Sequence, residues 1–202
     1  MLRLALVITA LVLAGVPSAG ANNGKAKTDE AKEAKRLFEA ASVTTLVAYR
    51  YASIEEVASI AAEAEGLDAA AAEARVRGAA SPDPRAGALA AAAVYCNWTE
   101  WQNGRGIFPY RRWIIGQTYW CYEYGGAITY RASNTAARVD GVCSGNNARD
   151  WKVAGGAGYS WVIVHHEADF SCATPWWYRL NDSLWMEPAF NSYGNTSMTA
   201  QN

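Results

Sequence analysis

Residues 159–172, YSWVIVHHEADFSC, are predicted to form a β-strand. Within this run, three polar side chains that could do chemistry stand two residues apart. Alternate side chains share one face of a strand, so His165, Glu167 and Asp169 should lie about 6–7 Å apart on one side. Such a row could supply an acid–base pair or bind a divalent ion. Polar residues also alternate on any solvent-facing strand, so the row is only a weak catalytic candidate. His166 faces the core side, where we expect a hydrogen-bonded histidine.

Other catalytic chemistry has little support in the sequence. No Gly-x-Ser-x-Gly elbow presents a serine nucleophile. The cysteines are widely spaced, without a CxxC pair, which argues against a zinc site. We therefore expect no metal and no cofactor, and the sequence favours a binding role over an enzymatic one without deciding between them.

Aromatic side chains offer a different chemistry, because exposed rings can stack on sugars or on side chains of a partner protein. Residues 95–202 contain all nine tryptophans and nine of the eleven tyrosines. These rings could equally fill the core of a β domain. The ligand-binding candidates are Trp98, Trp101, Trp120, Tyr122, Trp176, Trp177 and Tyr178.

Four cysteines could connect the strands that carry these rings. Cys96, Cys121, Cys143 and Cys172 are even in number, and an exported chain would oxidise them to two disulfides. Three pairings are open. Each bridge could contribute roughly 2–4 kcal/mol to a domain of this size.

A β-hairpin is predicted around Gly125-Gly126, two residues that tolerate the positive φ of a tight turn. The expected register pairs Trp120 with Arg131, Cys121 with Tyr130, and Tyr122 with Thr129. Trp120 and Tyr122 then share one face and Cys121 lies on the other, which we expect to be the core side. The indole of Trp120 and the guanidinium of Arg131 could form a cation–π contact.

The N-terminal half has a different composition. Residues 1–21 combine an early Arg3, a short apolar run and an A-x-A site, which predicts a cleaved signal peptide and secretion without stable membrane insertion. Residues 22–94 form an Ala-rich helical arm or pro-segment, with one possible strand and helices capped by Ser53 and Asp68. The sequence Ser-Pro-Asp-Pro at 81–84 marks the expected linker.

Residues 95–202 are predicted to form an aromatic-rich, disulfide-linked β domain. Short strands separated by Gly and Asn turns favour a small antiparallel β-sandwich or barrel behind the helical arm, so the fold class is mainly β. We expect a loop over residues 138–147. Eight basic and eight acidic residues balance in this domain, which argues against nucleic acid as a partner.

Several short motifs carry a resemblance. Trp120-Cys121-Tyr122 precedes a glycine turn and a Thr-rich return strand, Asp169-Phe170-Ser171-Cys172 follows, and Tyr193-Gly194-Asn195-Thr196 comes late. Over residues 113–200 the chain resembles a group of uncharacterised secreted actinobacterial proteins with a Trp-Cys-Tyr hairpin. Glu123-Tyr124 before the glycines and the long helical arm depart from that pattern. The resemblance implies a fold but no activity.

These observations together predict a secreted binding or interaction module whose partner is a carbohydrate, a cell surface or another protein. One alternative is a secreted hydrolase that residues 22–94 keep inactive as a pro-segment, with His165, Glu167 and Asp169 at its site. A secreted toxin or inhibitor is a third possibility.

Overall fold

The computed structural model describes residues 23–78, 93–175 and 178–202. The expected signal peptide, most of the expected linker, and Trp176 and Trp177 lie outside these residues. The chain divides into two compact units, Met1–Glu33 and Ala34–Asn202. Helix α1 (Asn23–Phe38) begins in the first unit and ends in the second. Among the described residues, no helix is long and apolar enough to cross a membrane.

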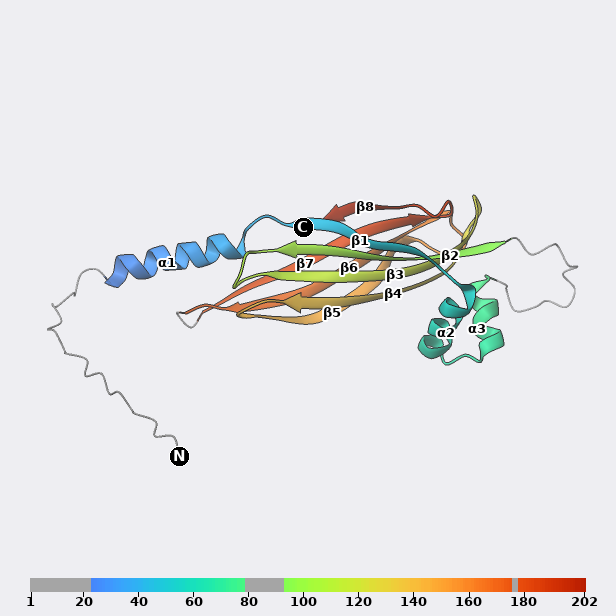
Figure 1. Ribbon diagram of the computed structural model, residues 1–202, viewed down its shortest axis with the longest axis horizontal. Coiled ribbons are helices and arrows are strands. Elements are labelled where there is room, and N and C mark those ends of the chain that lie inside the picture. Colours follow the sequence, from blue (N-terminus) through green and yellow to red (C-terminus); the bar gives the residue numbers. More distant parts are fainter. Residues whose placement is uncertain (1–22, 79–92, 176–177) are drawn as a thin grey trace, which may run out of the picture. The chain divides into compact units, whose positions relative to one another are not determined.

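Eight strands form two antiparallel sheets, each with its strands in chain order (Figure 1). The first sheet contains β1 (Val43–Ala52), β2 (Val94–Arg105), β3 (Arg112–Glu123) and β4 (Ile128–Val139). The second sheet contains β5 (Cys143–Gly155), β6 (Trp161–Ala173), β7 (Arg179–Asn191) and β8 (Thr196–Gln201). The mainly β prediction is confirmed. The loop expected over residues 138–147 shrinks to residues 140–142, because β4 and β5 continue through its ends.

The inner faces of the two sheets pack against each other as a β-sandwich. Strand β6 shows the pattern most clearly, since buried and half-buried residues alternate between its two exposed end residues. The interior contains two clusters, to which both sheets contribute. One comprises Trp101, Ile114, Ala168, Phe170, Leu184 and Met186, and the other Trp120, Tyr122, Ile128, Val162, Val164 and Phe190. Alternation along each strand therefore builds the core.

The hairpin between β3 and β4 keeps most of the expected register. Trp120 pairs with Arg131 and Cys121 with Tyr130, as predicted. The turn has three residues rather than two, because the N–H of Glu123 bonds to the carbonyl of Ala127. A bulge leaves Thr129 unpaired, so Tyr122 pairs with Ile128 and the expected pair of Tyr122 with Thr129 is wrong. Beyond the bulge the pairing follows the expected register.

Both faces of this hairpin are buried, which corrects the expectation that the core lies on the cysteine side. Trp120 faces the second sheet, where its ring lies 4.7 Å from that of Phe190. Arg131 does not stack on Trp120 but pairs with Asp150 at 3.8 Å. Cys121 faces outward beneath two helices and is equally buried. The interior of the sandwich therefore lies on one face of β3, and a further hydrophobic cluster, beneath the two helices, lies on the other.

The two helices that cover this outer face are α2 (Ile54–Glu65) and α3 (Ala69–Val76). Ser53 and Asp68 cap them as predicted, each accepting a backbone N–H with its side chain. Val57, Ala61 and Val76 are fully buried against the first sheet. Strand β1 also joins this sheet through antiparallel pairing with β2. The segment expected to be a separate arm is therefore, from Ala34 onward, part of the same unit as the β domain.

Two disulfides connect neighbouring strands, and they resolve the open question of the pairing. Cys96 bonds to Cys121 between β2 and β3, and Cys143 bonds to Cys172 between β5 and β6. The first disulfide lies in the cluster under α2 and α3, and the second contacts Phe38 and Tyr110.

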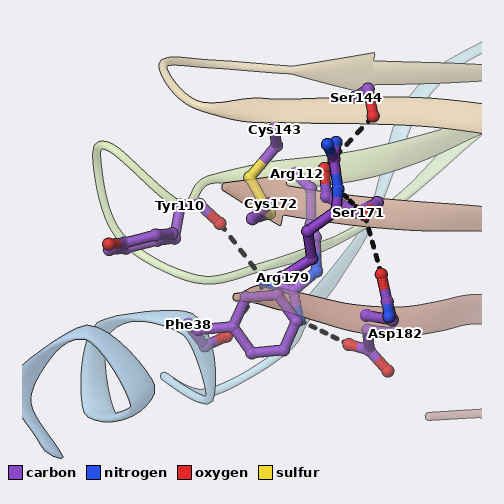
Figure 2. The surroundings of a disulfide bond; sticks show 10 residues. Phe38, Tyr110, Arg112, Cys143, Ser144, Ser171, Cys172, Arg179 and Asp182 are labelled. Carbon is purple, nitrogen blue, oxygen red and sulfur yellow. Dashed lines mark hydrogen bonds and ion pairs between the residues drawn. A yellow bond between two sulfur atoms is a disulfide. The ribbon is translucent and has the colours of Figure 1, made fainter. Parts of the chain in front are cut away.

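A buried arginine lies near the second disulfide (Figure 2). Arg112 on β3 has no exposed surface and pairs with Asp182 on β7 of the other sheet. It also donates to the carbonyl oxygens of Phe38 and Tyr110, at 2.9 and 3.2 Å, and lies 3.7 Å from the centre of the Phe38 ring. Burial lowers the pKa of the guanidinium, while Asp182 opposes that shift. Arg112 therefore links the end of α1 to both sheets.

Asp182→Asn should lower the free energy of unfolding by about 3–5 kcal/mol, because it leaves a buried guanidinium without its counter-ion. Urea unfolding of the variant and of the wild type measures this difference. Glu63→Gln also converts a carboxylate to an amide, but at an exposed site on α2, and should change the free energy of unfolding by less than about 0.5 kcal/mol. Equal effects of the two substitutions would contradict the role assigned to the ion pair.

A buried histidine joins the sheets at the centre of the sandwich. His166 has no exposed surface, and its ring nitrogens lie 3.2 Å from the Thr118 hydroxyl and 2.8 Å from the Thr135 hydroxyl. The ring packs closely on Gly116, where an added Cβ would lie 2.6 Å from it. The core-facing orientation of His166 is as expected, and the hydroxyl partners explain how a polar ring is accommodated.

Stability should fall as this histidine becomes protonated. Burial lowers the pKa of His166 to about 4. The Asp150 carboxylate opposes this shift, and Arg131 and His165 add to it. Because the unfolded chain binds the proton at higher pH, the free energy of unfolding is greatest above about pH 6.5 and declines as pH falls toward 4. The expected loss is about 2 kcal/mol between about pH 7 and pH 5.

Urea unfolding over this pH range measures that loss. His166→Gln should remove most of the slope, because a neutral amide cannot take up the proton, and His165 remains in both proteins as an internal control. An unchanged slope in the variant would show that another group causes the pH dependence.

Candidate binding surface

Three of the seven aromatic residues predicted to bind ligand serve the core instead. Trp101, Trp120 and Tyr122 are buried between the sheets, because their positions alternate onto the inner faces of β2 and β3. Trp98 is half-buried on the outer face, with the guanidinium of Arg50 at 5.0 Å from its ring. Tyr178 is exposed, and Trp176 and Trp177 lie outside the described residues. The buried rings of Trp101, Trp120 and Tyr122 therefore offer no surface to a ligand.

Exposed aromatic residues gather elsewhere, at the end of the sandwich that contains the β3–β4 and β7–β8 turns. We call this group the tyrosine surface, and five exposed rings from separate segments form it. They are Tyr49 and Tyr51 on β1, Tyr95 on β2, Tyr124 in the turn after β3, and Tyr193 in the turn after β7. Their exposed fractions range from 42% to 75%. The rings are too exposed to be core residues.

Ring contacts arrange four of these tyrosines in two pairs and place the fifth, Tyr95, against the buried ring of Tyr122. Tyr49 meets Tyr51 edge to face at 6.3 Å, and Tyr124 meets Tyr193 in the same way at 5.5 Å. Tyr95 lies 6.1 Å from the buried ring of Tyr122. Such pairs favour defined ring orientations, so the rings are held in place before a ligand arrives.

Two buried residues beneath the rings hold the segments together. Asn97 on β2 donates to the Tyr122 hydroxyl at 3.1 Å and to the carbonyl oxygen of Gly194 at 3.3 Å. The Tyr49 hydroxyl donates to the same carbonyl at 2.9 Å. Gly194 has a positive φ of 83°, and an added Cβ would lie 2.5 Å from the Tyr122 hydroxyl. Only glycine lets this turn approach the first sheet so closely.

The tyrosine surface is polar but uncharged. Its five residues carry phenol groups, and its support consists of an asparagine amide and backbone carbonyls. Burial raises the pKa of both Tyr49 and Tyr122, so these phenols remain protonated at neutral pH. The surface can therefore stack on apolar faces of a ligand and exchange hydrogen bonds with its hydroxyl groups.

The His165 row occupies one face of β6, as predicted, but other side chains engage it. The His165 ring stacks between Trp151 and Trp185, at 4.0 and 5.5 Å, and its Nδ1 lies 2.8 Å from a carboxylate oxygen of Glu187. Its Nε2 lies 3.7 Å from Glu167 and has no hydrogen-bond partner among the described residues. The neighbouring rings restrict access to the imidazole.

Arg149 pairs with both carboxylates of the row, and its distance to Asp169 is 3.6 Å. Arg149 pairs with Glu167 at 2.9 Å, and the Ser183 hydroxyl donates to Glu167 at 2.7 Å. Asp169 accepts from the Asn147 amide at 3.0 Å. Within the described residues, no group of three or more His, Cys, Asp or Glu side chains could hold a metal ion. The row thus behaves as a cross-strand network on the outer face of the second sheet.

The tyrosine surface was missed by sequence reasoning, although a signal was present. Four of its members stand near a strand end or in a turn beside glycine or asparagine, where a bulky ring has no core to enter. Their assembly at one place depends on pairing between strands distant in sequence.

Comparisons with known proteins add no relative to this description: no family model matches the chain, and neither the curated proteins nor the solved structures yield a match.

Proposed function

We propose that this protein is an extracellular binding module that holds an uncharged carbohydrate chain on the tyrosine surface. The observation that carries the proposal is the presence of five exposed tyrosines, four of them in two ring pairs, around the buried Tyr122 and the Gly194 turn. Sugar rings present apolar C–H faces and many hydroxyl groups. Phenol rings complement both features, and they lose little conformational entropy on binding.

The extracellular location is supported by the two disulfides, which persist in oxidising compartments. Secretion through the signal peptide at residues 1–21 is part of this proposal. A binding role is favoured over catalysis because His165, Glu167 and Asp169 lie on a sheet face where neighbouring side chains occupy them.

Removing single rings should weaken carbohydrate binding. Tyr51→Ala and Tyr124→Ala should each reduce affinity for a retained polysaccharide about tenfold, because each removes roughly 1–2 kcal/mol of ring contact. Depletion assays on cellulose, chitin, β-1,3-glucan, starch and mannan measure retention of the wild type and of both variants.

Tyr178→Ala is the matched control, because this exposed tyrosine precedes β7 at the opposite end of the sandwich. Its retention should equal that of the wild type. The proposal fails if none of the five polysaccharides retains the wild type, or if the Tyr51 and Tyr124 variants are retained as well as the control.

Gly194→Ala tests the support of the surface. The added methyl would displace Tyr122 and force an L-residue into a positive φ, so we expect a loss of about 1–3 kcal/mol in stability. Binding should also weaken in protein that remains folded by circular dichroism. Ordinary stability and ordinary binding in this variant would contradict the role assigned to the turn.

A further inference from the structure

A hollow lies on the outer face of the first sheet, away from the tyrosine surface. It has a volume of about 390 Å³, within the range of small-molecule sites. Helices α2 and α3 cover the part of this face around Cys96 and Cys121. The hollow lies at the opposite strand ends, around Gly104 and Trp113.

The pairing of the strands leaves one indole accessible from this hollow. Trp113 on β3 pairs with Gly104 on β2 and with Arg138 on β4. Gly104 places no side chain beside Trp113, and an added Cβ would come within 3.3 Å of the Trp113 Cβ. The guanidinium of Arg111 lies 5.6 Å from the indole centre. Trp113 therefore provides a flat wall flanked by cationic groups.

All charged residues that line the hollow are arginines: Arg105, Arg111, Arg112 and Arg138. Arg105 and Arg112 share the carboxylate of Asp182. Arg111 and Arg138 are exposed and form no ion pair with an acidic residue of the described chain. Asp140 contacts Arg111 through its backbone N–H. Among the described residues, the hollow thus presents two guanidinium groups without an acidic partner beside an aromatic wall.

We infer that this hollow binds a sugar carrying a carboxylate, such as a uronic acid residue. The guanidinium groups of Arg111 and Arg138 would take the carboxylate, since arginine matches its planar, two-oxygen geometry. The sugar ring would lie against Trp113. This site differs from the tyrosine surface in charge, in its location on the outer face and in the residues that form it, so either can fail without the other.

Calorimetric titration of the whole protein with tetragalacturonate tests the inference. We expect saturable binding that weakens at least tenfold in Arg138→Gln and in Arg111→Gln, because each loses a charge-assisted hydrogen bond. Both side chains are exposed, so urea unfolding should remain unchanged. In two-dimensional NMR spectra, the indole N–H signal that Trp113→Phe removes should shift on titration.

Three controls define the class of ligand and the place of binding. The methyl ester of tetragalacturonate should bind at least tenfold more weakly, and inorganic phosphate should bind more weakly than the uronate. Tyr51→Ala should leave uronate binding unchanged. Absence of saturable binding, full binding by the doubly substituted Arg111→Gln/Arg138→Gln protein, or equal affinity for the ester or phosphate would overturn the inference.

Discussion

The buried ion pair between Arg112 and Asp182 is the interaction on which the arrangement of the sandwich depends most. Desolvation of the guanidinium costs several kcal/mol, and only a set of partners in correct geometry offsets it. Asp182 comes from the second sheet, and two carbonyl oxygens come from Phe38 and Tyr110. The native alignment of both sheets with the end of α1 is therefore the arrangement that gives this charge its counter-ion and two carbonyl acceptors. At the sandwich centre, His166 with its two threonine hydroxyls imposes a similar requirement.

The helical segment and the β domain are interdependent. Strand β1 supplies the edge of the first sheet, and α2 and α3 cover the outer face around the Cys96–Cys121 disulfide. The alanine-rich helices bury too little surface to fold alone, since small side chains remove little apolar area from water. They become stable by packing on the first sheet. A segment that looks separate in composition is thus one layer of the fold.

Both proposed ligand sites arise where strands place side chains that the core cannot use. The tyrosine surface forms where β1, β2 and two turns extend rings into solvent, supported by Asn97 and Gly194. The arginine-lined hollow forms where Gly104 places no side chain beside the Trp113 indole. The first surface is uncharged and the second is cationic, so the two suit different chemical groups. Together they fit a module that contacts a surface of mixed neutral and acidic sugars.

Local patterns in the sequence determined the β class, the helix caps at Ser53 and Asp68, the alternation along β6 and most of the β3–β4 register. These features depend on side-chain spacing and on contacts between near neighbours. Tertiary structure decided the disulfide pairing, the inward direction of Trp120, the place of β1 and the assembly of the tyrosine surface. Each depends on which distant strands pair, and strand pairing is a long-range choice that periodicity leaves open. The bulge at Thr129 illustrates how the two levels differ. One extra residue changed the partner of Tyr122 near the turn, while the pairs of Cys121 and Trp120 remained those that the sequence predicts.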